Sequence, residues 1–266
     1  MSEEQALVFA NEDSPLFVPG AFDIAAAMMR DEPKITEAFR TGAGVGWGEH
    51  DACLFRGTER FFRPGYAGNL TRNWLPALDG VVAKLERGAS IADVGCGHGA
   101  STILMAQAYR KSQLVGFDFH QTSIDRARER AAAADVADRV RFEIAAAKDF
   151  PGKYDLVAFF DCLHDMGDPV GAAAHVREAL QADGTWMIVE PFASDEVAEN
   201  LNPVGRMFYS ASTMICSPAS RAQEVGLALG AQAGPKRISE VVKAAGFSRV
   251  RVATQTPFNL VIEARP

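Results

Sequence analysis

From residue 89 onward, short apolar runs alternate with amphipathic stretches. The apolar runs are of strand length and cover Ser90–Val94, Gln113–Phe117, Val140–Ile144, Tyr154–Phe160 and Trp186–Val189. The helical patterns between them cover Ser101–Arg110, Ser123–Ala134 and a stretch from Asp168 to Leu180. Asp168 followed by Pro169 is typical of a helix start, because aspartate caps free N–H groups and proline fits the first turn. This alternation predicts a parallel sheet with right-handed helical crossovers.

The last two predicted strands are joined differently. Arg249–Ala253 and Asn259–Glu263 are separated only by the short join from Thr254 to Phe258. A helical crossover does not fit into so short a join, so these two strands must run antiparallel.

Two parts of the chain do not follow this alternation of strand and helix patterns. In residues 1–80, short apolar clusters alternate with Gly and Pro, and the pattern predicts helices over Phe22–Arg30 and Pro33–Arg40. Residues 191–234 are rich in Ser, Ala, Gly and Met, and we expect them to form an insertion over the carboxyl edge of the sheet. The expected organisation is a helical cap (1–80), a core (81–190 and 235–266) and a lid insertion (191–234).

Composition narrows the possible partners. The chain has 266 residues, with 27 Lys and Arg against 34 Asp and Glu, and a formal net charge of −7. Because it lacks the broad positive field that holds phosphate backbones, we do not expect nucleic acid as a partner. No apolar run approaches the ~20 residues that cross a bilayer. The acidic N-terminus has no secretion signal, so we expect a cytoplasmic protein with no membrane partner.

A glycine-rich loop carries the main chemical signal. It reads Asp93-Val-Gly95-Cys-Gly97-His-Gly99 and lies where a predicted strand meets a helix, whose free N–H groups can face a ligand. The spacing of the glycines also matches the dinucleotide-binding fingerprint. However, a carboxylate at Asp93 suits an ammonium group and repels a pyrophosphate. Asp118 ends the next strand, 19 residues after Gly99, where a ribose diol is held. The loop therefore predicts a nucleoside ligand with an amino-acid tail.

These motifs, in this order, resemble the class I S-adenosylmethionine-dependent methyltransferases over residues 89–266. The resemblance also rests on the strand Tyr154–Val157, on Leu163-His-Asp165 and on the antiparallel pair at the C-terminus. It implies an α/β fold with a Rossmann-like seven-stranded sheet in the order 3-2-1-4-5-7-6, strand seven antiparallel. It implies S-adenosylmethionine as cofactor and S-adenosylhomocysteine as product.

The resemblance also implies which residues hold the methionine end of the cofactor. These are Asp93, Gly95, Cys96 and Gly97 at the loop, with Asp161 and Cys162 lining the site near the sulfonium. Tyr66, together with Arg56 and Arg63, is expected to close over the cofactor, because an aromatic face favours a cation and arginines pair with carboxylates.

At the adenosine end, the resemblance places Asp118 on the ribose hydroxyls and Phe119 beside the adenine. Family members often have an aspartate after strand three that accepts the adenine amino group, and Ala146 stands at that position. We therefore expect backbone groups at Ala147 or Lys148 to contact adenine instead.

Two histidines are candidates for the catalytic base. His164 lies in a Leu-His-Asp-Met-Gly-Asp segment similar to one in plant-type small-molecule O-methyltransferases, whose histidine is the base, and imidazole titrates near neutrality. His50, in Glu49-His50-Asp51, is the second candidate, since a flanking carboxylate would fix its tautomer. For each histidine, a packing or loop role is the alternative.

No candidate site resembles a metal site. The 4 cysteines are far apart without CxxC spacing, and we expect reduced thiols rather than a disulfide framework. The sequence thus predicts metal-independent transfer to the oxygen, or alternatively the nitrogen, of a small and partly apolar acceptor. Candidate residues for an apolar acceptor pocket are Trp47, Trp74, Met207, Phe208 and Met214.

Two other functions stay open at this point. Glu49-His50-Asp51, residues 56–66, residues 163–169 and Pro257–Leu260 resemble a bacterial methyltransferase group whose members often carry an N-terminal winged helix, which is not visible ahead of residue 1. A cofactor-sensing regulator without turnover is therefore one alternative. A nicotinamide-dependent oxidoreductase is the other, although the chain has no Tyr-x-x-x-Lys pair. A homodimer is compatible with the sequence.

Overall fold

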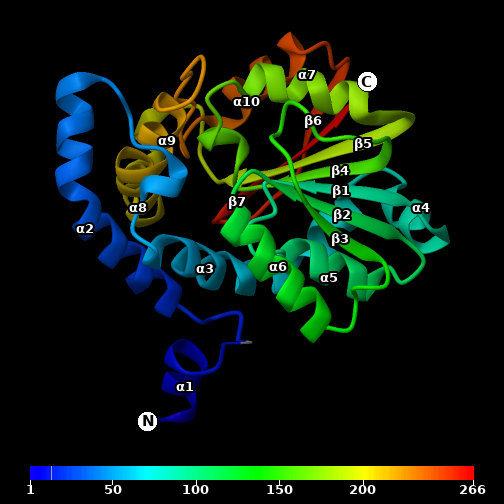
Figure 1. Ribbon diagram of the computed structural model, residues 1–266, viewed down its shortest axis with the longest axis horizontal. Coiled ribbons are helices and arrows are strands. Elements are labelled where there is room, and N and C mark those ends of the chain that lie inside the picture. Colours follow the sequence, from blue (N-terminus) through cyan, green and yellow to red (C-terminus); the bar gives the residue numbers. More distant parts are fainter. Residues whose placement is uncertain (13) are drawn as a thin grey trace.

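The computed structural model describes residues 1–12 and 14–266. Seven strands form one sheet in the order β3-β2-β1-β4-β5-β7-β6, which confirms the predicted topology (Figure 1). Strand β7 runs antiparallel to β5 and β6, and the other neighbouring pairs are parallel. The strands are β1 (Ser90–Val94), β2 (Gln113–Asp118), β3 (Val140–Ile144), β4 (Tyr154–Phe160), β5 (Leu180–Pro191), β6 (Arg249–Gln255) and β7 (Asn259–Arg265).

Helices cover both faces of this sheet. One face carries α4 (Val81–Arg87), α5 (Ala100–Ala108) and α6 (Gln121–Ala133), and the other carries α7 (Pro169–Ala179) and α10 (Gly234–Ala244). The start of α7 is as predicted, because the Asp168 side chain accepts a hydrogen bond from the backbone N–H of Gly171.

The apolar run Leu156–Phe160 of β4 reflects burial on both sides. Leu156, Ala158 and Phe160 belong to the core beneath α5 and α6, whereas Val157 and Phe159 belong to the core beneath α7 and α10. Successive side chains of a strand point to opposite faces, so a parallel strand covered on both faces is apolar at successive positions, and the one charged residue of β4, Asp155, lies near its start. This places the polar residues that follow β4 at the carboxyl edge of the sheet.

The N-terminal part forms helices beside that edge. They are α1 (Glu3–Phe9), α2 (Pro19–Thr41), the 3₁₀ turn η1 (Trp47–Glu49), α3 (Cys53–Asn69), the π-helical turn η2 (Leu70–Trp74) and the 3₁₀ turn η3 (Leu75–Ala77). The prediction of two helices separated before Pro33 was wrong, since α2 is continuous through it. Proline removes one helical hydrogen bond, and burial of Ala27 and Ile35 on either side offsets this loss.

Helices α2 and α3 pack closely and are joined by ion pairs. A Cβ atom on Gly57 would lie 2.8 Å from the Cβ of Asp23, so only glycine permits this approach. The Asp23 carboxylate accepts from Arg56 at 2.9 Å and from Arg60 at 2.6 Å. Arg56 pairs with Asp23, Arg63 pairs with Glu12 and Glu59, and neither lines the cavity described below, so their predicted role over a cofactor stays a prediction.

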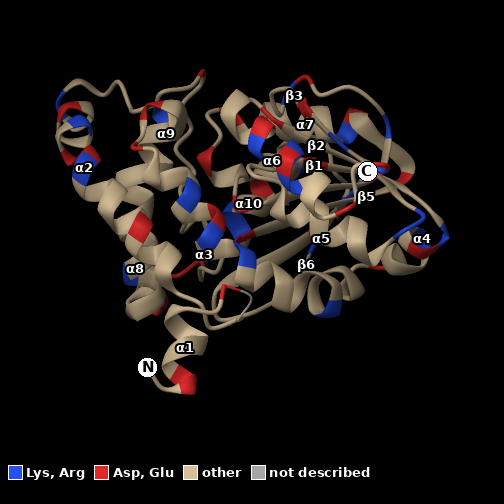
Figure 2. Cartoon of the chain, turned by 60° about the horizontal axis from the view of Figure 1, so that its bottom comes forward, with Lys and Arg blue, Asp and Glu red and all other residues tan. Residues whose placement is uncertain are grey.

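Residues 191–234 are largely helical. They contain η5 (Val197–Asn200), α8 (Pro203–Ala211), the π-helical turn η6 (Ser212–Cys216) and α9 (Ser217–Arg221), and the turn η4 (Leu163–Asp165) lies beneath them after β4. In Figure 1, α8 and α9 lie between α2 and the sheet. Acidic and basic residues are interspersed over the elements shown in Figure 2. Within the described ranges, no helix has both the length and the apolar character needed to cross a membrane.

Candidate active site

A cavity of about 470 Å³ lies at the carboxyl ends of the central strands, a volume typical of small-molecule sites. Its walls come from the loops after β1, β2, β3 and β4, from α3 and from the segment that follows α9. Ten of the predicted cofactor residues line it, namely Tyr66, Gly95, Cys96, Gly97, Asp118, Phe119, Ala147, Lys148, Asp161 and Cys162. The sequence therefore located the cavity correctly, while the contacts of these residues with a cofactor stay predictions.

Backbone hydrogen bonds fix the glycine loop against Asp118. The N–H of Gly97 donates to Oδ2 of Asp118 and the N–H of His120 donates to Oδ1, both at 2.9 Å. Gly95 has a φ of +73°, and a Cβ there would lie 2.8 Å from Sγ of Cys162. Burial raises the pKa of Asp118. The carboxylate is thus held at the cavity wall with room on both oxygens for a further donor.

Asp93 lies beneath the loop and does not line the cavity. Its Oδ2 accepts hydrogen bonds from the hydroxyls of Ser101 and Thr102, both at 2.6 Å, and its Oδ1 is buried without a hydrogen-bond partner. Burial raises the pKa of Asp93 to about 6. This side chain fixes the first turn of α5 below the loop, and its direct contact with a methionine tail stays a prediction.

Asp161 presents a carboxylate oxygen without a partner at the cavity wall. Tyr66 donates its hydroxyl to Oδ2 at 2.7 Å, and Oδ1 is buried with no hydrogen bond. Burial and the nearby Glu190 raise the pKa of Asp161 to about 7. The residue also has a φ of +50°, a strained conformation for aspartate that is often found at functional sites. A cationic group in the cavity would relieve this unfavourable burial.

His164 is buried behind the wall, beside Asp165. Its Nδ1 contacts Oε2 of Glu190, and Oε1 of Glu190 accepts from the backbone N–H of Leu163 at 3.0 Å. Its Nε2 lies 3.2 Å from Oδ1 of Asp165, which does line the cavity. Burial alone would lower the pKa of His164, but Asp165 and Glu190 raise it well above its ordinary value. The two carboxylates therefore make this imidazole more basic than that of an exposed histidine.

His50 is a second buried histidine held by a carboxylate, but not by the predicted one. Its Nδ1 lies 3.0 Å from Oδ2 of Asp31 in α2, and the adjacent Glu49 and Asp51 do not bind it. Its Nε2 is buried without a hydrogen-bond partner, and the ring does not line the cavity. The expectation of a flanking carboxylate was wrong because the partner comes from a helix 19 residues earlier in the chain.

Among the predicted apolar candidates, Trp47 lines the cavity with Phe55 and Phe62 of α3. The ring of Phe55 stacks on His120 with 4.8 Å between centroids, so α3 covers the loop after β2. Trp74 and Phe208 are buried away from the cavity, Met207 is partly exposed, and Met214 packs against the small core cluster that contains Cys216.

Sequence reasoning missed the partners of both histidines. Glu190 gave a signal that could have been used, because an acidic residue follows the apolar run of a buried strand at the carboxyl edge of the sheet. Asp31 and Cys216 gave none, since their roles depend on how distant helices pack.

Comparison with known proteins agrees with the geometry. A family model described as a methyltransferase domain matches residues 85–246. The 27-O-demethylrifamycin SV methyltransferase of Amycolatopsis mediterranei is 30% identical over 162 residues, which is 60% of this chain and 48% of that protein. This chain thus matches about half the length of that relative.

Solved structures share the fold. An O-methyltransferase family protein from Burkholderia thailandensis has a TM-score of 0.73 and 18% identity, covering 98% of this chain and 76% of that chain. Human N-acetylserotonin methyltransferase in complex with S-adenosylmethionine has a TM-score of 0.68 and 16% identity, covering 99% and 74%. The family resemblance is confirmed: the chain belongs to the methyltransferase domain family, and its fold is the one that these methyltransferase structures share.

Proposed function

We propose that this protein transfers the methyl group of S-adenosylmethionine to an oxygen atom of a small, partly apolar molecule, with His164 as the proton acceptor. The observation that carries the proposal is the buried Glu190–His164 pair, which lies directly behind the cavity wall formed by Asp161 and Asp165. The name of the Amycolatopsis relative, an O-methyltransferase of a small molecule, supports the same reaction class.

The cavity offers each part of the cofactor a matching group. Asp118 would accept the ribose hydroxyls, Phe119 would lie beside the adenine, and the backbone at Ala147 and Lys148 would contact its edge. Oδ1 of Asp161 has no partner and would accept the ammonium group of the methionine tail. When bound, the cofactor supplies a methyl group on a sulfonium leaving group, so the chain's own tasks are alignment and proton removal.

The proton step uses the histidine and its carboxylate partners. Asp165 lines the cavity, so an acceptor hydroxyl would meet this carboxylate first, and Nε2 of His164 lies 3.2 Å behind it. Glu190 holds Nδ1 and stabilises the imidazolium that forms after proton transfer. His50, held by Asp31, is the second candidate for contact with the acceptor.

The proposal keeps the remaining predictions unchanged. They are metal-independent transfer, a cytoplasmic location and a small-molecule acceptor rather than nucleic acid. The helices of residues 1–80 and 191–234 would enclose that acceptor. Acidic and basic residues are interspersed along the cartoon in Figure 2, which supports an acceptor other than nucleic acid.

A metabolite screen with S-adenosylmethionine labelled in its methyl group tests the proposal. The expected result is label on the hydroxyl of a small phenol or alcohol. Label found solely on nucleic acid or protein would contradict it. Tight binding of S-adenosylhomocysteine with no transfer to any acceptor would instead favour the cofactor-sensing alternative.

A further inference from the structure

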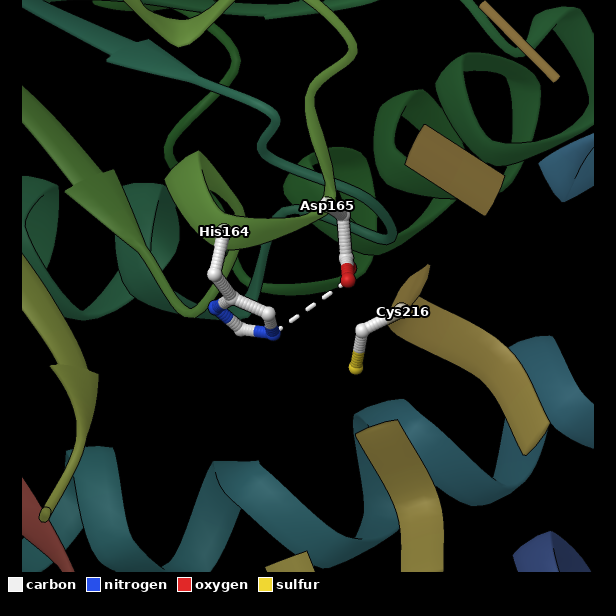
Figure 3. Close-up of side chains that lie close together, drawn as sticks. All are labelled: His164, Asp165 and Cys216. Atoms are coloured by element: carbon white, nitrogen blue, oxygen red, sulfur yellow. Dashed lines mark ion pairs between the residues drawn. The ribbon is translucent and has the colours of Figure 1, made fainter. Parts of the chain in front are cut away.

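A buried cluster of three different side chains lies next to the proposed acceptor end. The imidazole of His164, the carboxylate of Asp165 and the thiol of Cys216 have their donor atoms within 4.8 Å of one another. His164 and Asp165 belong to η4, directly after β4, whereas Cys216 ends η6 in the inserted segment (Figure 3). Two segments far apart in sequence therefore present nitrogen, oxygen and sulfur to one point.

The orientation of His164 is that of a metal ligand. Its Nδ1 contacts the Glu190 carboxylate, so Nε2 is the ring nitrogen that faces Asp165 and Cys216. Histidines that bind metals almost always donate their other ring N–H to a carboxylate or carbonyl, because this fixes the tautomer and the ring.

The distance between the two ligand atoms of η4 also suits a bound ion. Oδ1 of Asp165 is buried, has no hydrogen-bond partner and lies 3.2 Å from Nε2 of His164. Two ligand atoms that each lie about 2.0–2.2 Å from one tetrahedral zinc ion are separated by a similar distance. Oδ1 of Asp165 and Nε2 of His164 are thus close enough to bind the same ion, although they form no hydrogen bond.

The backbone at Cys216 is unusual as well. The π-helical turn η6 (Ser212–Cys216) ends at this residue and places the thiol within 4.8 Å of the ligand atoms of His164 and Asp165. π-helical turns are rare and frequently occur at functional sites. Cys216 is 6% exposed, so its sulfur is shielded from solvent and faces the two polar groups.

We propose that His164, Asp165 and Cys216 bind one thiophilic divalent cation of the Zn²⁺ type, for which a mixed nitrogen, oxygen and sulfur set is suitable. On binding, the Cys216 thiol releases its proton to water and coordinates as a thiolate. The imidazole likewise releases the proton of Nε2 to water, coordinates through Nε2 and keeps its Nδ1–H on Glu190. A water molecule completes the four-coordinate ion.

The bound ion has two consequences for the chain. It ties the inserted segment to the loop after β4, and it occupies the Nε2 lone pair that a general base needs. The second consequence rests on the proposed function and makes the ion an inhibitor rather than a participant in methyl transfer. His164 and Cys216 do not line the cavity, so the ion lies behind the acceptor rather than in contact with it.

Titration of the chelator-treated full chain with Co²⁺ tests the site. We expect one Co²⁺ per chain, with a near-ultraviolet thiolate-to-cobalt band and visible bands of tetrahedral cobalt that Zn²⁺ abolishes by competition. Cys216→Ser removes the thiolate band. The matched control Cys53→Ser keeps it, because the Cys53 sulfur accepts from Arg30 at 2.9 Å and lies outside the cluster.

Absence of the band in the unmodified chain, or its persistence in Cys216→Ser, would overturn the proposal. If Cys216→Ser does not fold, protection of Cys216 from a maleimide by one equivalent of Zn²⁺, measured by mass spectrometry, answers the same question. None of these readouts needs an acceptor, so failure of the metal site is distinguishable from failure of the proposed methyl transfer. Once an acceptor is known, Zn²⁺ should inhibit the chelator-treated protein and chelator should restore its rate.

Discussion

The two ends of the candidate site are built in different ways. The cofactor end is made by loops that directly follow β1, β2 and β4, and its key contacts are backbone hydrogen bonds such as those of Gly97 and His120 to Asp118. The acceptor end is made by side chains from distant segments, with His164 held by Glu190 and His50 held by Asp31. Local motifs therefore define the first end, whereas tertiary packing defines the second.

This difference predicts that the two ends can be damaged separately. A change at the acceptor end should reduce the rate of transfer and leave cofactor affinity intact. A change at the cofactor end should weaken cofactor binding and leave the rate of transfer at saturating cofactor intact.

The largest expected effect is that of His164→Gln. Glutamine keeps a polar side chain of similar length but cannot accept the proton, so kcat should fall by about 10²–10⁴-fold. Calorimetry with S-adenosylhomocysteine should give an affinity close to that of the unmodified chain. Normal turnover of the variant would show that His164 is not the base and only packs.

Asp118→Ala should affect the cofactor end of the site and weaken cofactor binding. Loss of the carboxylate leaves the N–H groups of Gly97 and His120 without their acceptor, together with the ribose hydroxyls. Cofactor binding should weaken by roughly 1–3 kcal/mol, which is the range for buried groups deprived of a partner. An unchanged dissociation constant in calorimetry would contradict the ribose assignment.

The strands and their order could be predicted from the sequence because each depends on local pattern and on the family resemblance. Strand β4 shows this well, since its apolar run from Leu156 to Phe160 follows directly from burial on both faces. The helix break at Pro33 was predicted wrongly, because packing of the flanking residues overrides the local cost of proline. The polar partners Asp31 and Glu190 lie 19 and 26 residues from the histidines that they hold, and no local pattern records such contacts.

A smaller effect is expected from Glu190→Gln. The amide still occupies the space beside His164 but cannot stabilise the imidazolium. By analogy with carboxylates that orient functional histidines, activity should fall by roughly 10–100-fold. Steady-state rates of the two variants test whether Glu190→Gln loses less activity than His164→Gln. A Glu190→Gln variant slower than His164→Gln would contradict this expectation.

The smallest expected effect is a pH dependence of cofactor affinity. Burial and Glu190 raise the pKa of Asp161 to about 7, while Tyr66 and His164 oppose this shift and Asp165 adds to it. Because the pKa lies above that of an exposed carboxyl, the empty folded site favours the protonated form, and this contribution to stability is lost as pH rises toward 7. An ammonium ligand prefers the ionised form, so its affinity should rise up to about tenfold from pH 6 to pH 8.

Calorimetry with S-adenosylhomocysteine at both pH values measures this change. Asp161→Asn serves as the control, because an amide cannot titrate and the pH dependence should disappear. Affinity that falls with rising pH in the unmodified chain would exclude Asp161 as the partner of the ammonium group.

A crystal structure of the chain with S-adenosylhomocysteine tests the division of the site most directly. We expect the ribose to lie on Asp118, the ammonium group to lie at Oδ1 of Asp161, and the sulfur to face the Asp165 side of the cavity, with Glu190 still in contact with His164. A ligand whose ribose avoids Asp118, or whose sulfur faces away from the histidine, would contradict it.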